Sequence, residues 1–109
     1  MIAGIGCDIV HVDRIKKQND AFYKRVLTEK EQELYLGFSE VRKLEFLAGR
    51  FAAKEAIYKA CNDTKVISNI EVLNDEFGRP YCDIAGFKIH ISISHDGDYA
   101  MAYAICEKV

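Results

Sequence analysis

The sequence lacks the features of several large classes of protein. Its 109 residues contain no run of about 18 apolar residues, so no membrane-spanning helix is expected. The first residues are apolar but have no basic leader, and they reach Asp8 early, so they predict a strand rather than a signal peptide. We therefore expect a cytoplasmic protein with no membrane partner, folded as a single domain over residues 1–109. At this size, oligomerisation is an expected way to bury more surface.

The cysteines lack any recognisable metal or disulfide pattern. They are scattered singly, without a C-x-x-C pair and without histidines at zinc spacing: Cys7, Cys61, Cys82 and Cys106. An even count suggests disulfide bonds in a secreted chain, but each cysteine here has apolar neighbours. We therefore expect buried thiols in a reducing compartment. Walker loops, Rossmann glycine patterns and nucleophile elbows are absent as well.

The chain has a net charge of only −2, but its basic residues are concentrated in two segments. Residues 11–26 and residues 41–59 each contain five basic and two acidic residues. Two such segments on an acidic protein indicate a local anionic partner, either a phosphorylated ligand or an acidic protein. Either segment alone is better explained as a solvated helix face. Because the chain as a whole lacks a basic excess, no nucleic acid partner is expected.

The first half of the sequence predicts one strand followed by helices. Residues 2–10 alternate as a strand, and residues 11–26 fit one or two short helices. Thr28 and Glu31 form a capping box at the start of a helix that extends to about Leu36.

The longest helix is predicted over residues 40–61, with Ser39 as its N-cap. The pattern then changes to strands separated by turns. The expected strands cover residues 69–74, 87–94 and 99–106, and the expected turns cover residues 74–80 and 95–98. This order predicts an α+β fold, in which an N-terminal strand, short helices and one long central helix pack on a mainly antiparallel sheet.

Two acidic side chains depart from the pattern around them, as residues of functional sites often do. Glu55 lies within about 20° of Leu44 on the helical wheel, inside an apolar stripe. A carboxylate buried there is costly unless a cation compensates it. Gly4 and Gly6 leave one face of the first strand without side chains, and Asp8 is the last residue on that face. The glycines leave room for a ligand, for the long helix or for both. If the helix packs on this face, Asp8 lies beside Glu55.

The two carboxylates predict a magnesium site. Mg²⁺ typically binds one or two protein carboxylates and completes its coordination with waters and phosphate oxygens. Arg50 and Lys54 lie between two apolar faces of the long helix, where they could point into a shared cleft. Lys59 follows Glu55 by one turn, so the alternative is an ordinary ion pair between these two side chains.

A third polar group lies at the end of the strand expected over residues 87–94. Its hydroxyl and histidine side chains, Ser92, Ser94 and His95, could bind phosphate or ribose. The alternative is that His95 is an exposed residue of the following turn.

Three motifs occur in order along the chain: Gly4-Ile-Gly-Cys-Asp-Ile-Val10, Phe46-Leu-Ala-Gly-Arg-Phe-Ala-Ala-Lys-Glu-Ala56 and Ile91-Ser-Ile-Ser-His95. With Gly78-Arg79-Pro80, they resemble the holo-acyl-carrier-protein synthases, the small type of 4′-phosphopantetheinyl transferase. The resemblance covers the whole chain, and its central motif is the most specific. It implies a cytoplasmic homotrimer with an active site at each subunit interface. The implied reaction uses Mg²⁺ to transfer phosphopantetheine from coenzyme A to a serine of an acidic apo-acyl carrier protein, for fatty acid synthesis, and releases adenosine 3′,5′-bisphosphate.

The resemblance also implies roles for single residues. Asp8 and Glu55 are expected to hold the metal and to form the catalytic group together with Lys59. The expected coenzyme A contacts are Arg50, Lys54, Lys59, Gly78, Pro80 and His95. The expected docking surface for the carrier comprises Arg14, Lys17, Lys24 and Arg25. The chain departs from the family in its short segment 62–69 and in Asp96, where a small hydroxyl residue is common.

Two other functions are compatible with the same residues. A Mg²⁺-dependent hydrolase of nucleotide diphosphate compounds needs the same carboxylates and basic groups but no protein partner. A non-catalytic module would use the basic helices to bind an acidic protein and would not need Asp8 or Glu55.

Overall fold

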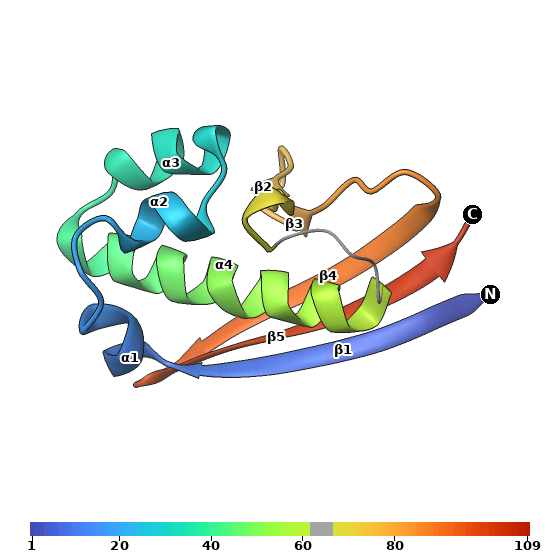
Figure 1. The fold of residues 1–109 in the computed structure, drawn as a ribbon, viewed down its shortest axis with the longest axis horizontal. Coiled ribbons are helices and arrows are strands. Elements are labelled where there is room, and N and C mark those ends of the chain that lie inside the picture. Colours follow the sequence, from blue (N-terminus) through green and yellow to red (C-terminus); the bar gives the residue numbers. More distant parts are fainter. Residues whose placement is uncertain (62–66) are drawn as a thin grey trace.

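The computed structural model describes residues 1–61 and 67–109, and it has the expected α+β architecture (Figure 1). Its main sheet is antiparallel, with the strand order β1-β5-β4. These strands and the long helix that lies along the sheet are β1 (Ile2–His11), β5 (Tyr99–Lys108), β4 (Phe87–Asp96) and α4 (Glu40–Cys61). Their order and most of their bounds agree with the prediction, although β4 extends two residues further and includes His95.

Three short helices connect β1 to α4. They are α1 (Val12–Lys16), α2 (Phe22–Val26) and α3 (Glu29–Leu36). Both bonds of the predicted capping box are present, because the Thr28 hydroxyl accepts from the Glu31 N–H and the Glu31 carboxylate accepts from the Thr28 N–H. The Ser39 hydroxyl accepts from the Arg42 N–H and so caps α4 as expected. In Figure 1, α2 and α3 lie on the opposite side of α4 from the sheet.

The segment after α4 differs from the prediction. The expected strand over residues 69–74 is wrong for most of its length, because a 3₁₀ helix occupies Ile67–Asn69 and only β2 (Leu73–Asn74) pairs with β3 (Pro80–Tyr81). The physical reason lies in Val72, whose N–H and C=O bond to side chains of Glu31 and Arg50 rather than to a neighbouring strand. The expectation of a short segment at 62–69 falls mainly on residues 62–66, which lie outside the described residues.

The glycines of β1 bring the backbone of α4 directly onto the strand. A Cβ at Gly4 would lie 2.0 Å from the Ala60 carbonyl oxygen, and a Cβ at Gly6 would lie 2.1 Å from that of Ala56. The helix therefore occupies the face that the glycines clear. Asp8 follows on the same face and comes to lie beside the helix.

The other face of the sheet has large apolar side chains that no described residue covers. The alternation expected in β1 is confirmed, and the face that points away from α4 carries exposed apolar side chains: Ile5 is 72% exposed and Ile9 is 61% exposed. Tyr103 on β5 is 56% exposed on the same face, opposite Cys7 in the register. An apolar sheet face of this kind is typical of an interaction surface.

The cysteines carry thiols, with no disulfide among the four described. Cys82 and Cys106 are buried as expected, but Cys7 is exposed on the outer face of β1, so that part of the prediction is wrong. No described helix combines the length and the apolar character needed to cross a membrane.

Candidate functional site

The first group of predicted site residues meets where β1 passes along α4. Lys59 places its Nζ 3.3 Å from Asp8 Oδ1 and donates to the Cys7 carbonyl oxygen at 3.1 Å. The Asp8 side chain is 18% exposed, whereas that of Lys59 is 52% exposed. The lysine thus spans from the helix to the strand and leaves the pair open to solvent on one side.

Glu55 adds a second carboxylate to this group. Partial burial raises the pKa of Glu55 above its usual value, the nearby charge of Asp8 raises it further, and Lys59 opposes both effects. Gly6 packs against Ala56 and Lys59, so Asp8, two residues further along the same face, lies beside the turn of α4 that carries Glu55. The alternative of a simple Glu55–Lys59 ion pair is wrong, since in the described part of the chain Lys59 pairs with Asp8 and Glu55 has no ion pair.

This donor set suits a hard divalent cation. Two carboxylates face one lysine, so the group carries excess negative charge that a cation would neutralise. No cluster of three or more histidine, cysteine or acidic side chains exists among the described residues, so a closed zinc or calcium site does not fit. Mg²⁺ fits, because it takes one or two protein carboxylates and leaves the remaining positions to water and phosphate.

A second group of predicted residues lines a groove of about 190 Å³ beside α4 and β4. Four of the six expected coenzyme A contacts lie in its wall: Arg50, Gly78, Pro80 and His95. Arg42 and Asn74 also line it and were not singled out from the sequence. Glu45 lines it too and pairs with Arg42 at 3.7 Å, so Arg50 is the cation that this groove offers to an anionic ligand.

His95 points toward α4 and away from the serines that precede it. Its Nε2 lies 2.9 Å from the Glu45 carbonyl oxygen, and a Cβ at Gly49 would lie 3.0 Å from the same nitrogen. Ser92 and Ser94 lie on the opposite, exposed face of β4, so these hydroxyls and His95 do not form one phosphate site. The alternative, that His95 belongs to the following turn, is wrong because β4 includes it. Asp96 likewise alternates away from His95 and does not place its charge in the groove.

Several contacts hold Arg50 in the groove wall. It is 6% exposed, its Nε donates to the Val72 carbonyl oxygen at 3.0 Å, and its guanidinium also bonds to the Asn74 side chain. The guanidinium lies 4.4 Å from the centre of the Phe46 ring. Burial lowers the pKa of Arg50 to about 10, and the charge of Glu31 opposes this shift. Arg50 therefore remains a cation at neutral pH.

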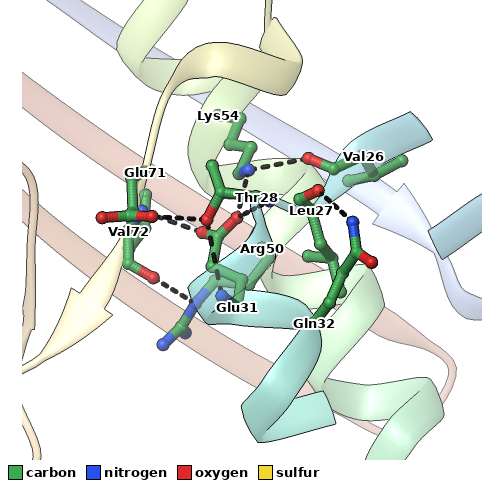
Figure 2. A network of polar contacts seen from close by, with 9 residues as sticks. All are labelled: Val26, Leu27, Thr28, Glu31, Gln32, Arg50, Lys54, Glu71 and Val72. Carbon is green, nitrogen blue, oxygen red and sulfur yellow. Dashed lines mark hydrogen bonds and ion pairs between the residues drawn. The ribbon is translucent and has the colours of Figure 1, made fainter. Parts of the chain in front are cut away.

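Lys54 departs from the expectation that it shares a cleft with Arg50. It is 0% exposed, and its Nζ lies 2.5 Å from Glu31 Oε1 and 2.7 Å from the Val26 carbonyl oxygen (Figure 2). Burial lowers the pKa of Lys54, although Glu31 opposes this shift. The charge of Lys54 is thus balanced by Glu31 inside the protein, and the side chain does not reach the groove. The helical wheel could not reveal this, because Glu31 lies on another helix.

The four basic residues predicted to dock a carrier are all exposed on α1, α2 and the segment between them: Arg14, Lys17, Lys24 and Arg25. None of them forms an ion pair with another described residue. A groove of about 490 Å³ lies beside them, with Ile15, Phe22 and Leu44 among its lining residues. Charged residues line the groove as well, among them Lys16, Asp20 and Lys43. The four exposed cations beside it, which have no ion-pair partner among the described residues, are suited to an acidic protein.

Comparison with known proteins identifies a family. A family model described as the 4′-phosphopantetheinyl transferase superfamily matches residues 4–104. The holo-[acyl-carrier-protein] synthase of Staphylococcus haemolyticus (strain JCSC1435) is 46% identical over 117 residues, which cover 99% of this chain and 98% of the relative. That of Geobacillus sp. (strain WCH70) is 46% identical over 118 residues, which cover 100% of this chain and 99% of the relative.

A solved structure has the same fold. The crystal structure of a holo-(acyl-carrier-protein) synthase from Bacillus anthracis str. Ames, in complex with CoA (3′,5′-ADP), superposes with a TM-score of 0.94 at 41% sequence identity. The alignment covers 100% of this chain and 99% of that chain.

Proposed function

Because the chain belongs to the 4′-phosphopantetheinyl transferase superfamily, we propose that it transfers the 4′-phosphopantetheine group of coenzyme A to a serine of apo-acyl carrier protein. The products are holo-acyl carrier protein and adenosine 3′,5′-bisphosphate, and the reaction supports fatty acid synthesis in the cytoplasm. The observation that carries the proposal is the solvent-open cluster of Asp8, Glu55 and Lys59. It contains two carboxylates but only one cationic side chain.

Asp8 and Glu55 are the residues that would hold Mg²⁺. When bound, Mg²⁺ would neutralise negative charge on the pyrophosphate oxygens of coenzyme A. Lys59 places its ammonium beside this position, where it offsets charge on the departing phosphate. In the transfer, the serine oxygen forms a bond to the phosphorus that bears pantetheine, and the bond from that phosphorus to the leaving phosphate breaks. The proton of the serine hydroxyl passes to water, and the nucleotide leaves with the bonding electrons.

The groove lined by Arg50 and His95 would bind the nucleotide part of coenzyme A. Its cation Arg50 suits the 3′-phosphate, and Gly78 and Pro80 form part of its wall. Lys54 is not part of this proposal, because it is fully buried against Glu31.

The two groups of site residues lie on opposite sides of α4. Asp8 lies on β1 and His95 on β4, which are the two edges of the main sheet, and α4 lies between them. Neighbouring copies could bring one group of each kind together. This arrangement and the exposed apolar face of β1 and β5 support a homotrimer with an active site at each subunit interface. Sedimentation at micromolar concentration tests it, and a monomeric active enzyme would contradict it.

The basic residues of α1 and α2 would dock the acidic carrier. Arg14→Glu should raise the KM for carrier by about tenfold, since a charge reversal at an exposed position opposes the encounter. The KM for coenzyme A should not change. Lys108→Glu, at the far end of β5, serves as the matched control. Equal KM values for carrier in both variants would remove Arg14 from the docking surface.

The main proposal is tested by the mass of purified apo-acyl carrier protein after incubation with the chain, coenzyme A and Mg²⁺. We expect the carrier to gain the mass of one phosphopantetheine, and a chelator to prevent the gain. Nucleotide release without carrier would instead identify the hydrolase. An unmodified carrier that nevertheless binds the chain would identify a non-catalytic module.

A further inference from the structure

A network of buried polar contacts joins α3 to α4 and to the segment before β2 (Figure 2). At its centre, Glu31 and Lys54 are both fully buried. Glu31 Oε1 accepts from Lys54 Nζ at 2.5 Å and from the Thr28 N–H at 2.7 Å. Lys54 also donates to the Val26 carbonyl oxygen at 2.7 Å, so this lysine links α4 to the end of α2 as well as to α3.

The second oxygen of Glu31 reaches outside this pair. Glu31 Oε2 accepts from the Val72 N–H at 2.8 Å, and the Val72 carbonyl oxygen accepts from Arg50 Nε at 3.0 Å. Val72 lies outside the regular strands, so these two bonds help to set its position. A continuous chain of contacts therefore leads from the carboxylate of Glu31 through one backbone residue to the guanidinium of Arg50.

Stability alone is a weak reason for this arrangement. A buried ion pair is often no more stabilising than apolar side chains of similar volume. A capping box needs only one oxygen of Glu31, which leaves the bond to Val72 without a role in the cap. That bond acts on the segment that holds Arg50, in the wall of the groove proposed for the nucleotide.

We infer that Glu31 is a positioning residue, which fixes Val72 and through it the orientation of Arg50 toward the nucleotide. Lys54 keeps the Glu31 carboxylate in place and balances its charge. Thr28 extends the network by donating from its hydroxyl to Glu71 at 2.5 Å, which ties down the residue next to Val72. The inference rests on the proposed function in so far as it assigns the groove to the nucleotide part of coenzyme A.

The inference predicts a specific kinetic effect. If Glu31 acts through Arg50, its loss weakens binding of the nucleotide and leaves the carboxylates of Asp8 and Glu55 unaffected. Glu31→Gln should therefore raise the KM for coenzyme A by about tenfold, because a hydrogen bond to a charged group is lost. Turnover at saturating coenzyme A and the dependence on Mg²⁺ should remain those of the wild type.

The first experiment measures the position of Arg50 without any ligand. The Nε–H of an arginine held in a hydrogen bond gives an NMR signal that exchanges slowly with water, and the signal of Arg50 is identified by its absence in Arg50→Lys. We expect Glu31→Gln to abolish this protection. Glu33→Gln, on the exposed side of the same helix, should keep it. Full protection in a folded Glu31→Gln variant would overturn the inference.

The second experiment measures the affinity for adenosine 3′,5′-bisphosphate in a double-mutant cycle. Glu31→Gln should weaken binding about tenfold in the wild-type background and leave it almost unchanged in Arg50→Ala. Equal losses in the two backgrounds would show that Glu31 does not act through Arg50. A wild-type chain that fails to bind this nucleotide would instead overturn the proposed nucleotide site, and the ligand-free NMR result separates the two failures.

A variant without buried charge covers the case in which Glu31→Gln does not fold. In Glu31→Leu/Lys54→Met, the ion pair is replaced by apolar side chains of similar size. We expect this protein to fold, to lack the slow exchange at Arg50 and to show the same loss of nucleotide affinity. Wild-type affinity in the folded double variant would show that the network is structural only.

Discussion

Two lysines on α4 face acidic side chains, and their surroundings are opposite. Lys54 and Glu31 are both 0% exposed and lie 2.5 Å apart. Lys59 is 52% exposed, and its Nζ lies 3.3 Å from Asp8, whose side chain is 18% exposed. The two lysines are only five positions apart in the sequence, so the local sequence does not separate their roles.

The balance of charge distinguishes the two clusters. One lysine meets one carboxylate in the buried cluster, and backbone N–H groups complete the bonds of Glu31. In the open cluster, Lys59 faces both Asp8 and Glu55, and the pKa of Glu55 is raised by burial and by the charge of Asp8. A balanced buried pair holds elements together, whereas an unbalanced open group still attracts a cation.

The largest expected difference between the clusters is in stability. Lys54→Ala should lower the free energy of unfolding by about 3–5 kcal/mol, because it leaves the Glu31 carboxylate buried and uncompensated. Lys59→Ala should cost no more than about 1 kcal/mol, as is usual for a solvent-exposed pair. Urea unfolding at neutral pH measures both values. Similar losses in the two variants would contradict the assignment of different roles.

The second difference is in catalysis. Glu55→Gln should lower kcat by about 10²–10³-fold, a loss typical of removing one group that stabilises transition-state charge. The far-UV circular dichroism should remain that of the wild type. Glu33→Gln provides a matched control on an exposed helix position and should retain full activity. A fully active Glu55→Gln variant would show that this carboxylate is not part of the active site.

The smallest expected effect concerns protonation of the open cluster in the absence of divalent ions. The folded-state pKa of Glu55 lies above its unfolded value, so its contribution to stability is greatest at low pH and is lost as pH rises through the folded-state pKa. Asp8→Asn removes one cause of this shift and should lower the pKa of Glu55. An NMR titration of the Glu55 carboxyl carbon measures the change, and an unaltered or higher pKa would show that the two carboxylates do not interact.

Much of the fold follows from local sequence patterns. The alternation in β1, the capping box at Thr28 and the long helix 40–61 are all present, because each depends on residues close together in the chain. The meeting of Asp8 and Glu55 was also predictable, since Gly4 and Gly6 mark the approach of the helix to the strand.

The remaining differences arise from contacts between distant segments. The strand expected at 69–74 is mostly absent, because side chains of Glu31 and Arg50 take the hydrogen bonds of Val72. Lys54 was expected beside Arg50, but its partner Glu31 lies 23 positions away on another helix. Hydrophobic periodicity carries no information about such a partner, so the roles of these residues required the structure.

The account depends most on the claim that Asp8 and Glu55 together bind one divalent ion. Crystals grown with Mn²⁺ and coenzyme A allow this ion to be located from its anomalous scattering. The account predicts one peak within coordination distance of both carboxylates and of a phosphate oxygen. A peak bound by only one of these carboxylates, or located at another part of the protein, would contradict it.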